Sequence, residues 1–169
     1  RKVDLSQVMG FLMRWKVIGP FDNTDRKGFA VAYPPEKEID FGASYEGKDG
    51  KVKWSDFSTS DSFGMVDVNL EYGELKQVVA YAHTIYESPE AQEVQFRLGC
   101  KNAWKIWLNG ELLFARDEYH RGIRVDQYAI DAKLKKGKNA ILVKFCQNEQ
   151  MQSWTKEWQF QIRVTDASG

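Results

Sequence analysis

Residues 92–142 decide the fold, and they read QEVQFRLGCKNAWKIWLNGELLFARDEYHRGIRVDQYAIDAKLKKGKNAIL. Val94, Phe96 and Leu98 alternate with polar neighbours, which is the period of a half-buried β-strand. The dipeptide Asn109-Gly110 predicts a hairpin, because a type I′ turn needs positive φ at both central residues. Four more strands are predicted around this turn, at 104–108, 111–115, 125–130 and 139–146.

The segments on either side continue the pattern of short strands separated by turn residues. The strand at 11–17 is expected to stop at Gly19-Pro20, since both residues interrupt regular structure. No long apolar stretch follows a helical period, and no repeat recurs at a fixed spacing. Strands are predicted at 11–17, 51–54, 65–70, 77–86 and 157–165.

This succession of strands predicts an all-β protein, an antiparallel β-sandwich of jelly-roll type. A chain of 169 residues is long enough for one domain with a buried core, expected at 11–166 after a lead-in at 1–10. Lys and Arg number 24, as do Asp and Glu, which argues against a nucleic-acid partner. No run approaches the ~20 apolar residues of a membrane span, so none is predicted.

Strand direction predicts that the long loops meet at one end of the sandwich. If neighbouring strands are antiparallel, the turn at 101–102 and loops 116–124 and 147–154 share one end, here called end A. The tight turns at 109–110 and 135–138 share the opposite end, end B. Binding residues concentrate on loops held by a rigid scaffold, although polar loops are also simply solvated. The candidate ligand-binding residues at end A are Trp104, Tyr119, His120, Arg121, Arg124, Asn148, Gln150 and Trp154.

These side chains suit a carbohydrate. Trp104 and Trp154 could stack on the apolar face of a sugar ring, or plug the end of the sandwich instead. Arginine and amide groups offer fixed donors and acceptors to neighbouring hydroxyls. Trp107 has the opposite parity to Ile106 and Leu108, so it is expected on a sheet face and is the next candidate. No catalytic constellation is visible, and no enzyme activity is predicted.

Metal and redox chemistry are weakly indicated. Asp22, Asn23 and Asp25 could supply oxygen ligands to a structural calcium ion, but Asx-turns explain the same residues. No cofactor is predicted otherwise. Cys100 and Cys146 are both expected at end A, but their opposite parity within their strands argues against a disulfide.

A recognisable pattern lies in the central stretch. The residues Gly99, Leu108, Asn109, Gly110, Gly137, Asn139, Ile141 and Val143 form it. The pattern resembles the galactose-binding-like β-sandwich domains, with a hairpin at Asn-Gly and a later Gly-x-Asn strand. The resemblance implies a jelly roll. Cys100-Lys101-Asn102 replaces the Ser-Asp-Asp usual in that family, which leaves the role of those carboxylates unsupported here.

The flanks carry a wider resemblance. WKVIGPFDNTDRKGFAVAYPPE at 15–36 is similar to domains of large secreted proteins of planctomycete-type bacteria, where such sandwiches are joined to cytochrome c modules. This implies an extracytoplasmic, non-catalytic carbohydrate-binding module within a larger protein. Its partners would be an oligo- or polysaccharide and neighbouring domains. The alternative is a structural sandwich that packs against a neighbouring domain and binds no sugar.

Overall fold

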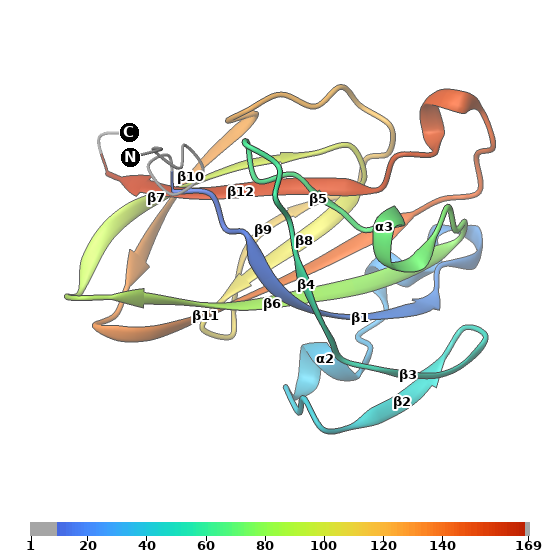
Figure 1. The fold of residues 1–169 in the computed structure, drawn as a ribbon, viewed down its shortest axis with the longest axis horizontal. Coiled ribbons are helices and arrows are strands. Elements are labelled where there is room, and N and C mark those ends of the chain that lie inside the picture. The colour runs from blue at the N-terminus through green and yellow to red at the C-terminus, as the bar shows by residue number, and fades with distance from the viewer. Residues whose placement is uncertain (1–9, 168–169) are drawn as a thin grey trace.

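The structure, a computed structural model, describes residues 10–167 and consists of two packed β-sheets (Figure 1). The larger sheet has six strands in the order β4-β1-β6-β11-β8-β9, and the smaller has four in the order β10-β7-β12-β5. A two-stranded hairpin, β2-β3, lies outside them. All the strand pairs described are antiparallel, which confirms the predicted antiparallel β-sandwich.

The elements follow one another as short strands with a few helical turns between them. The strands are β1 (Arg14–Asp22), β2 (Ser44–Gly47), β3 (Gly50–Lys53), β4 (Ser55–Ser58), β5 (Val66–Asp67), β6 (Val78–Ser88), β7 (Gln92–Cys100), β8 (Ala103–Leu108), β9 (Glu111–Arg116), β10 (Tyr128–Leu134), β11 (Gly137–Gln147) and β12 (Gln159–Asp166). The helical segments are η1 (Thr24–Ala30), α2 (Pro34–Lys37), α3 (Asn69–Tyr72) and η2 (Ser153–Thr155). Within the described residues, no helix is long and apolar enough to cross a membrane.

Three predicted boundaries were wrong. β1 does not stop at Gly19-Pro20 but continues to Asp22, because the pairing with β6 shifts register between Ile18 and Phe21 and so tolerates the proline. The segment 65–70 gives only a two-residue strand before α3 begins. β10 starts at Tyr128 rather than 125. The predicted lead-in at 1–10 lies almost wholly outside the described residues.

Aromatic side chains fill the core between the two sheets. Trp15 and Trp158 lie there, as their alternation with polar neighbours predicts, and they are 3% and 0% exposed. The ring of Trp15 meets the edge of Phe160 at 5.3 Å between centroids, and Phe145 lies 5.2 Å from Trp158. Burial of such large apolar surfaces is the main source of stability in a sandwich of this size.

A second apolar cluster lies on the outer face of the six-stranded sheet, beneath residues 23–54, here called the cover. The cover carries α2 and the β2-β3 hairpin and lies on the side of this sheet away from β12 (Figure 1, in cyan). The buried Lys144 amine, on β11, fastens it by donating to the carbonyls of Phe29 and Val31 at 3.0 and 2.6 Å. Lys144 also pairs with Glu36 at 2.8 Å, and the Tyr81 hydroxyl donates to the same carboxylate.

The two cysteines are free and lie in different layers. Cys100 belongs to the core between the sheets, whereas Cys146 belongs to the cluster under the cover. Their side chains therefore leave their strands on faces that do not meet, as the parity argument predicts.

Candidate functional site

Loops 116–124 and 147–154 meet at end A, as strand direction predicts. Nε2 of His120, on the first loop, lies 2.7 Å from Oδ1 of Asn148 on the second. The same Asn148 oxygen accepts a hydrogen bond from the backbone N–H of Gln150 at 3.1 Å, within the second loop. His120 has a positive φ of 54°, a conformation uncommon outside glycine. The residue that contacts Asn148 therefore has a left-handed backbone conformation.

The segment after β1 also joins end A, and sequence reasoning missed it. Asn23 donates through Nδ2 to the Tyr119 hydroxyl at 3.0 Å and to the Gln147 carbonyl at 2.9 Å. Arg26 forms a two-pronged pair with Glu149 at 2.8 and 3.1 Å, and its guanidinium lies 5.1 Å from the centre of the Tyr119 ring. The only sequence clue was the cluster of turn residues after β1, which does not reveal where the loop lies.

Trp104, a predicted site residue, lies in the core and does not reach the surface. Trp104 is 0% exposed and packs between the sheets, 5.7 Å from the Phe114 ring and 6.2 Å from the Phe160 ring. It therefore cannot offer a face to a sugar, and its placement at end A as a ligand residue was wrong. Its parity already indicated this, because Trp104 shares the inward-facing parity of Ile106 and Leu108.

Three other predicted residues brace the loops. Asn148 is 0% exposed, and its side chain contacts His120 and Gln150 within the two loops. Tyr119 is half-buried against the cluster under the cover and is held by Asn23. Arg121 donates to the carbonyls of Asn102 and Glu118, and its guanidinium lies over the Tyr128 ring. These three side chains therefore hold the loops of end A together, and they offer little surface to a ligand.

The accessible part of the predicted site is smaller. Trp154 is 68% exposed on η2, Arg124 is exposed, and Gln150 and His120 are half-buried. Burial lowers the pKa of His120, and the hydrogen bond to Asn148 opposes that shift. His120 therefore favours the neutral form at neutral pH, in which one ring nitrogen donates and the other accepts. End A thus offers an indole face beside neutral hydrogen-bonding groups.

The residues considered for calcium bind other parts of the protein. Asp22 accepts hydrogen bonds from the Thr24 hydroxyl and N–H at 2.6 and 3.2 Å, in the manner of an Asx-turn. Asn23 Oδ1 accepts the N–H of Gly28 at 2.9 Å. Asp25 faces Lys27 at 4.0 Å. Across residues 10–167 no group of three or more His, Cys, Asp and Glu side chains is arranged to hold a metal ion.

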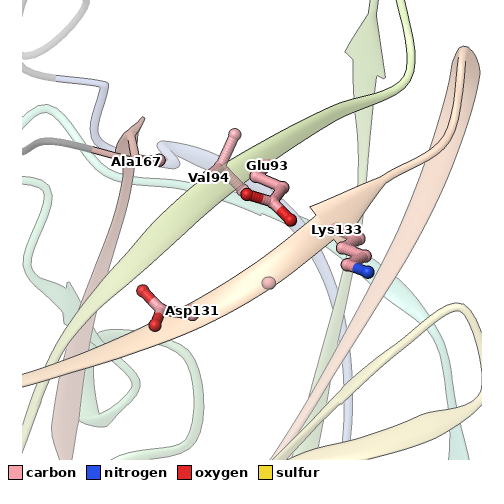
Figure 2. A pocket seen from close by; sticks show the side chains of 6 residues that line it. Glu93, Val94, Asp131, Lys133 and Ala167 are labelled. Carbon is pink, nitrogen blue, oxygen red and sulfur yellow. The ribbon is translucent and has the colours of Figure 1, made fainter.

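A hollow of about 370 Å³ lies at the other end of the smaller sheet, over β7 and β10 (Figure 2). Glu93 and Lys133 line it as register partners on these strands, and Asp131 accepts a hydrogen bond from Gln95 at 3.2 Å. None of the residues that line it is aromatic. Cross-strand pairing accounts for these charges, and we assign no ligand to this hollow.

Comparisons with known proteins establish the fold and leave the family open. No family model and no curated protein matches the chain. Among solved structures, the β-glucosidase from Kluyveromyces marxianus in complex with glucose matches with a TM-score of 0.52 and 14% identity. The match covers 90% of this chain and 16% of the β-glucosidase chain.

Smaller sandwich domains also match. The PA14 domain of the antifreeze protein MpAFP has a TM-score of 0.42 and 15% identity, over 54% of this chain and 45% of that one. A family 35 carbohydrate binding module from Clostridium thermocellum has a TM-score of 0.34 and 14% identity, over 53% and 72%. The similarity to the β-glucosidase, at a TM-score of 0.52 and 14% identity, shows a shared fold.

Proposed function

We propose that the chain is a non-catalytic carbohydrate-binding module of a larger secreted protein, and that a sugar binds at end A. The observation that carries this is Trp154, a large aromatic residue that is 68% exposed on the loop that also bears Asn148 and Gln150. An exposed indole costs solvation free energy unless a partner covers it. A sugar ring supplies an apolar face for the indole and hydroxyls for the polar groups beside it.

The rest of end A is consistent with a site formed before the ligand arrives. A hydrogen bond between two loops holds His120, and one within loop 147–154 holds Gln150, so ligand binding requires little further ordering of these residues. Arg124 adds an exposed charge at the end of loop 116–124. A small wet site of this kind should bind with a Kd on the order of micromolar to millimolar. Secretion and attachment to further domains belong to the proposal.

Affinity electrophoresis through gels containing laminarin, arabinoxylan or galactomannan tests the function. We expect one of these polysaccharides to retard the parent, and Trp154→Ala and Arg124→Ala to weaken the retardation while thermal unfolding stays cooperative. Met151→Ala is the matched control, because Met151 is 75% exposed on the same loop and has no aromatic face. Equal retardation of the parent, Trp154→Ala and Arg124→Ala would overturn the site at end A.

A second function is favoured by a different observation at the same end. Leu70, Met151 and Trp154 are all highly exposed, at 79%, 75% and 68%. The helix of Leu70 adjoins the segment after η2, since Asn69 donates to the Lys156 carbonyl at 2.8 Å. Apolar groups exposed in this way suit docking to a neighbouring domain. Docking would be weakened by Leu70→Ala and Met151→Ala as well as Trp154→Ala, whereas of these three variants only Trp154→Ala should weaken sugar binding.

A further inference from the structure

One row of residues crosses the outer face of the six-stranded sheet where the cover ends. Strand register aligns Asp56, Lys16, His83, Leu142 and Trp107 on β4, β1, β6, β11 and β8. The four gaps between these strands give the row a length of roughly 19 Å. The next row toward end A contains Lys144, which is buried under the cover and pairs there with Glu36. The row of His83 is only partly covered.

Two hollows open along this row and meet at His83. The first, of about 240 Å³, lies over β1, β4 and β6 between Asp56 and Phe41. The second, of about 170 Å³, lies between the segment 35–39 and the strands that carry Trp107 and Leu142. Phe41 reaches over the row from the cover, with its ring centre 5.1 Å from that of His83. We call the two hollows together the row groove.

His83 is the polar group at the centre of the row groove. Its side chain is 5% exposed, and both hollows are lined by it. Within residues 10–167 the ring accepts and donates no hydrogen bond, and its contacts are the rings of Phe41 and Trp54. The ring nitrogens are not among the fully buried side-chain atoms that lack a partner, so they open to the groove, where a ligand hydroxyl or a water can pair with them.

The chemistry of the lining selects an uncharged ligand with both apolar and hydroxyl surfaces. Three basic and three acidic residues line the two hollows, so the groove carries no excess charge. Lys16 is already paired with Asp56 at 2.7 Å, and Glu36 with Lys144. Aromatic side chains stand at both parts of the groove, Phe41 over one and Trp107 in the other. A charged ligand would find these charges already compensated.

We infer that the row groove binds a segment of a neutral polysaccharide, lying across the strands with Phe41 and Trp107 against its sugar rings and His83 hydrogen-bonded to a hydroxyl. This site is separate from end A, and it rests on the proposed carbohydrate-binding function. A groove of this length accepts several sugar units, whereas the small surface at end A suits one or two. Binding here should therefore tighten as the oligosaccharide lengthens.

The chain contains two histidines, one at each site, and they provide a test without mutation. The imidazole nitrogen–proton correlation spectrum of the parent is recorded while laminarin, arabinoxylan or galactomannan oligosaccharides of increasing length are added. We expect the His83 resonances to move, with an apparent Kd that falls as the oligosaccharide lengthens. Phe41→Ala and Trp107→Ala should each weaken this binding about tenfold, as loss of a central aromatic contact does. Phe63→Ala is the matched control, since Phe63 is 50% exposed outside the groove.

The outcomes separate this inference from the proposed function. If retardation occurs and only His120 moves, the row groove is overturned and the site at end A stands. If only His83 moves, the row groove is supported and the site at end A falls. Retardation with neither histidine moving overturns both sites but leaves carbohydrate binding. No retardation and no movement with any of the three polysaccharides overturns the inference and the proposed function together.

Discussion

At the scale of single residues, Lys144 shows how a buried charge is tolerated when each donor has a partner. Its side chain is 0% exposed, and its amine donates to two carbonyls and to Glu36, which is 11% exposed. Burial lowers the pKa of Lys144, and the bond and the charge of Glu36 oppose that shift. Three donors and three acceptors match, so the amine remains satisfied away from water.

Removing one member of this pair should be costly. We expect Lys144→Met to lower the free energy of unfolding by about 3 kcal/mol, because it leaves the Glu36 carboxylate without its cationic partner and two carbonyls without the amine that donates to them. The double variant with Glu36→Gln should recover part of this loss. Lys27→Met is the control, since Lys27 is 79% exposed in the same cover. Urea unfolding measures each value, and a change below about 0.5 kcal/mol in Lys144→Met would contradict the argument.

The two histidines should make stability depend on pH. Burial lowers the pKa of both His83 and His120, so the folded state binds fewer protons than the unfolded state, in which a histidine titrates near 6.5. Stability is then highest above this value and falls as the pH drops through it. We expect unfolding free energy to decrease between about pH 7 and pH 5, by at most ~1.4 kcal/mol per pH unit for each histidine. Replacing both by glutamine should flatten this slope, and an unchanged slope would show that other groups cause it.

At the scale of elements, the most recognisable residues of the sequence turn out to join two turns at end B. Asn109 and Gly110 have φ values of 50° and 84°, as the predicted hairpin requires. Asn109 donates to Oδ1 of Asn139 at 2.9 Å, and the Ala140 N–H donates back to Asn109 at 2.9 Å. The Asn-Gly and Gly-x-Asn patterns are therefore one structural unit. This explains why they predict the fold well and say little about a ligand.

Asn139 should be sensitive to substitution for the same reason. It is 0% exposed, and its amide also accepts from the Lys135 N–H and donates to the carbonyls of Tyr86, Lys135 and Gly137. Asn139→Ala leaves several part-buried groups unpaired and should lower the unfolding free energy by about 2 kcal/mol. Lys138→Ala, an exposed neighbour, should change it by less than ~0.5 kcal/mol. Similar values for the two variants would show that the amide contacts contribute little.

The sequence predicted what depends on local period and missed what depends on distant contacts. Strands β6, β7, β8, β9, β11 and β12 follow from alternation and turn chemistry, and the meeting of two loops at end A follows from strand direction. The cover could not be predicted, because its place is fixed by Lys144 and Tyr81, more than forty residues along the chain. The row groove depends on that cover. Hence the position of His83 in the groove, and its missing hydrogen bond, could not be foreseen from the sequence.

At the scale of the whole molecule, the six-stranded sheet has an apolar cluster on each face. The inner cluster joins the two sheets, and the outer one joins the larger sheet to the cover. The outer cluster is smaller and depends on polar fastenings at Lys144 and Tyr81. Parts of a protein with fewer buried apolar contacts open at lower free energy, so the cover should open before the sandwich unfolds.

The two cysteines report on these two events, since one lies in each cluster. Burial raises the pKa of both thiols to about 12, so neither should react with a thiol reagent in the native protein. In mild denaturant Cys146 should react first, because opening the cover exposes it, whereas Cys100 requires separation of the sheets. Cys100→Ala and Cys146→Ala leave one thiol each and assign the rates, with fully denatured protein as the reference. Equal protection of the two thiols across all denaturant concentrations would mean that cover and sandwich open as one unit, and faster reaction of Cys100 would reverse the order.

If the cover opens first, ligands of the row groove should slow the reaction of Cys146 selectively, since they contact the cover through Phe41 and the sheet through His83 at once.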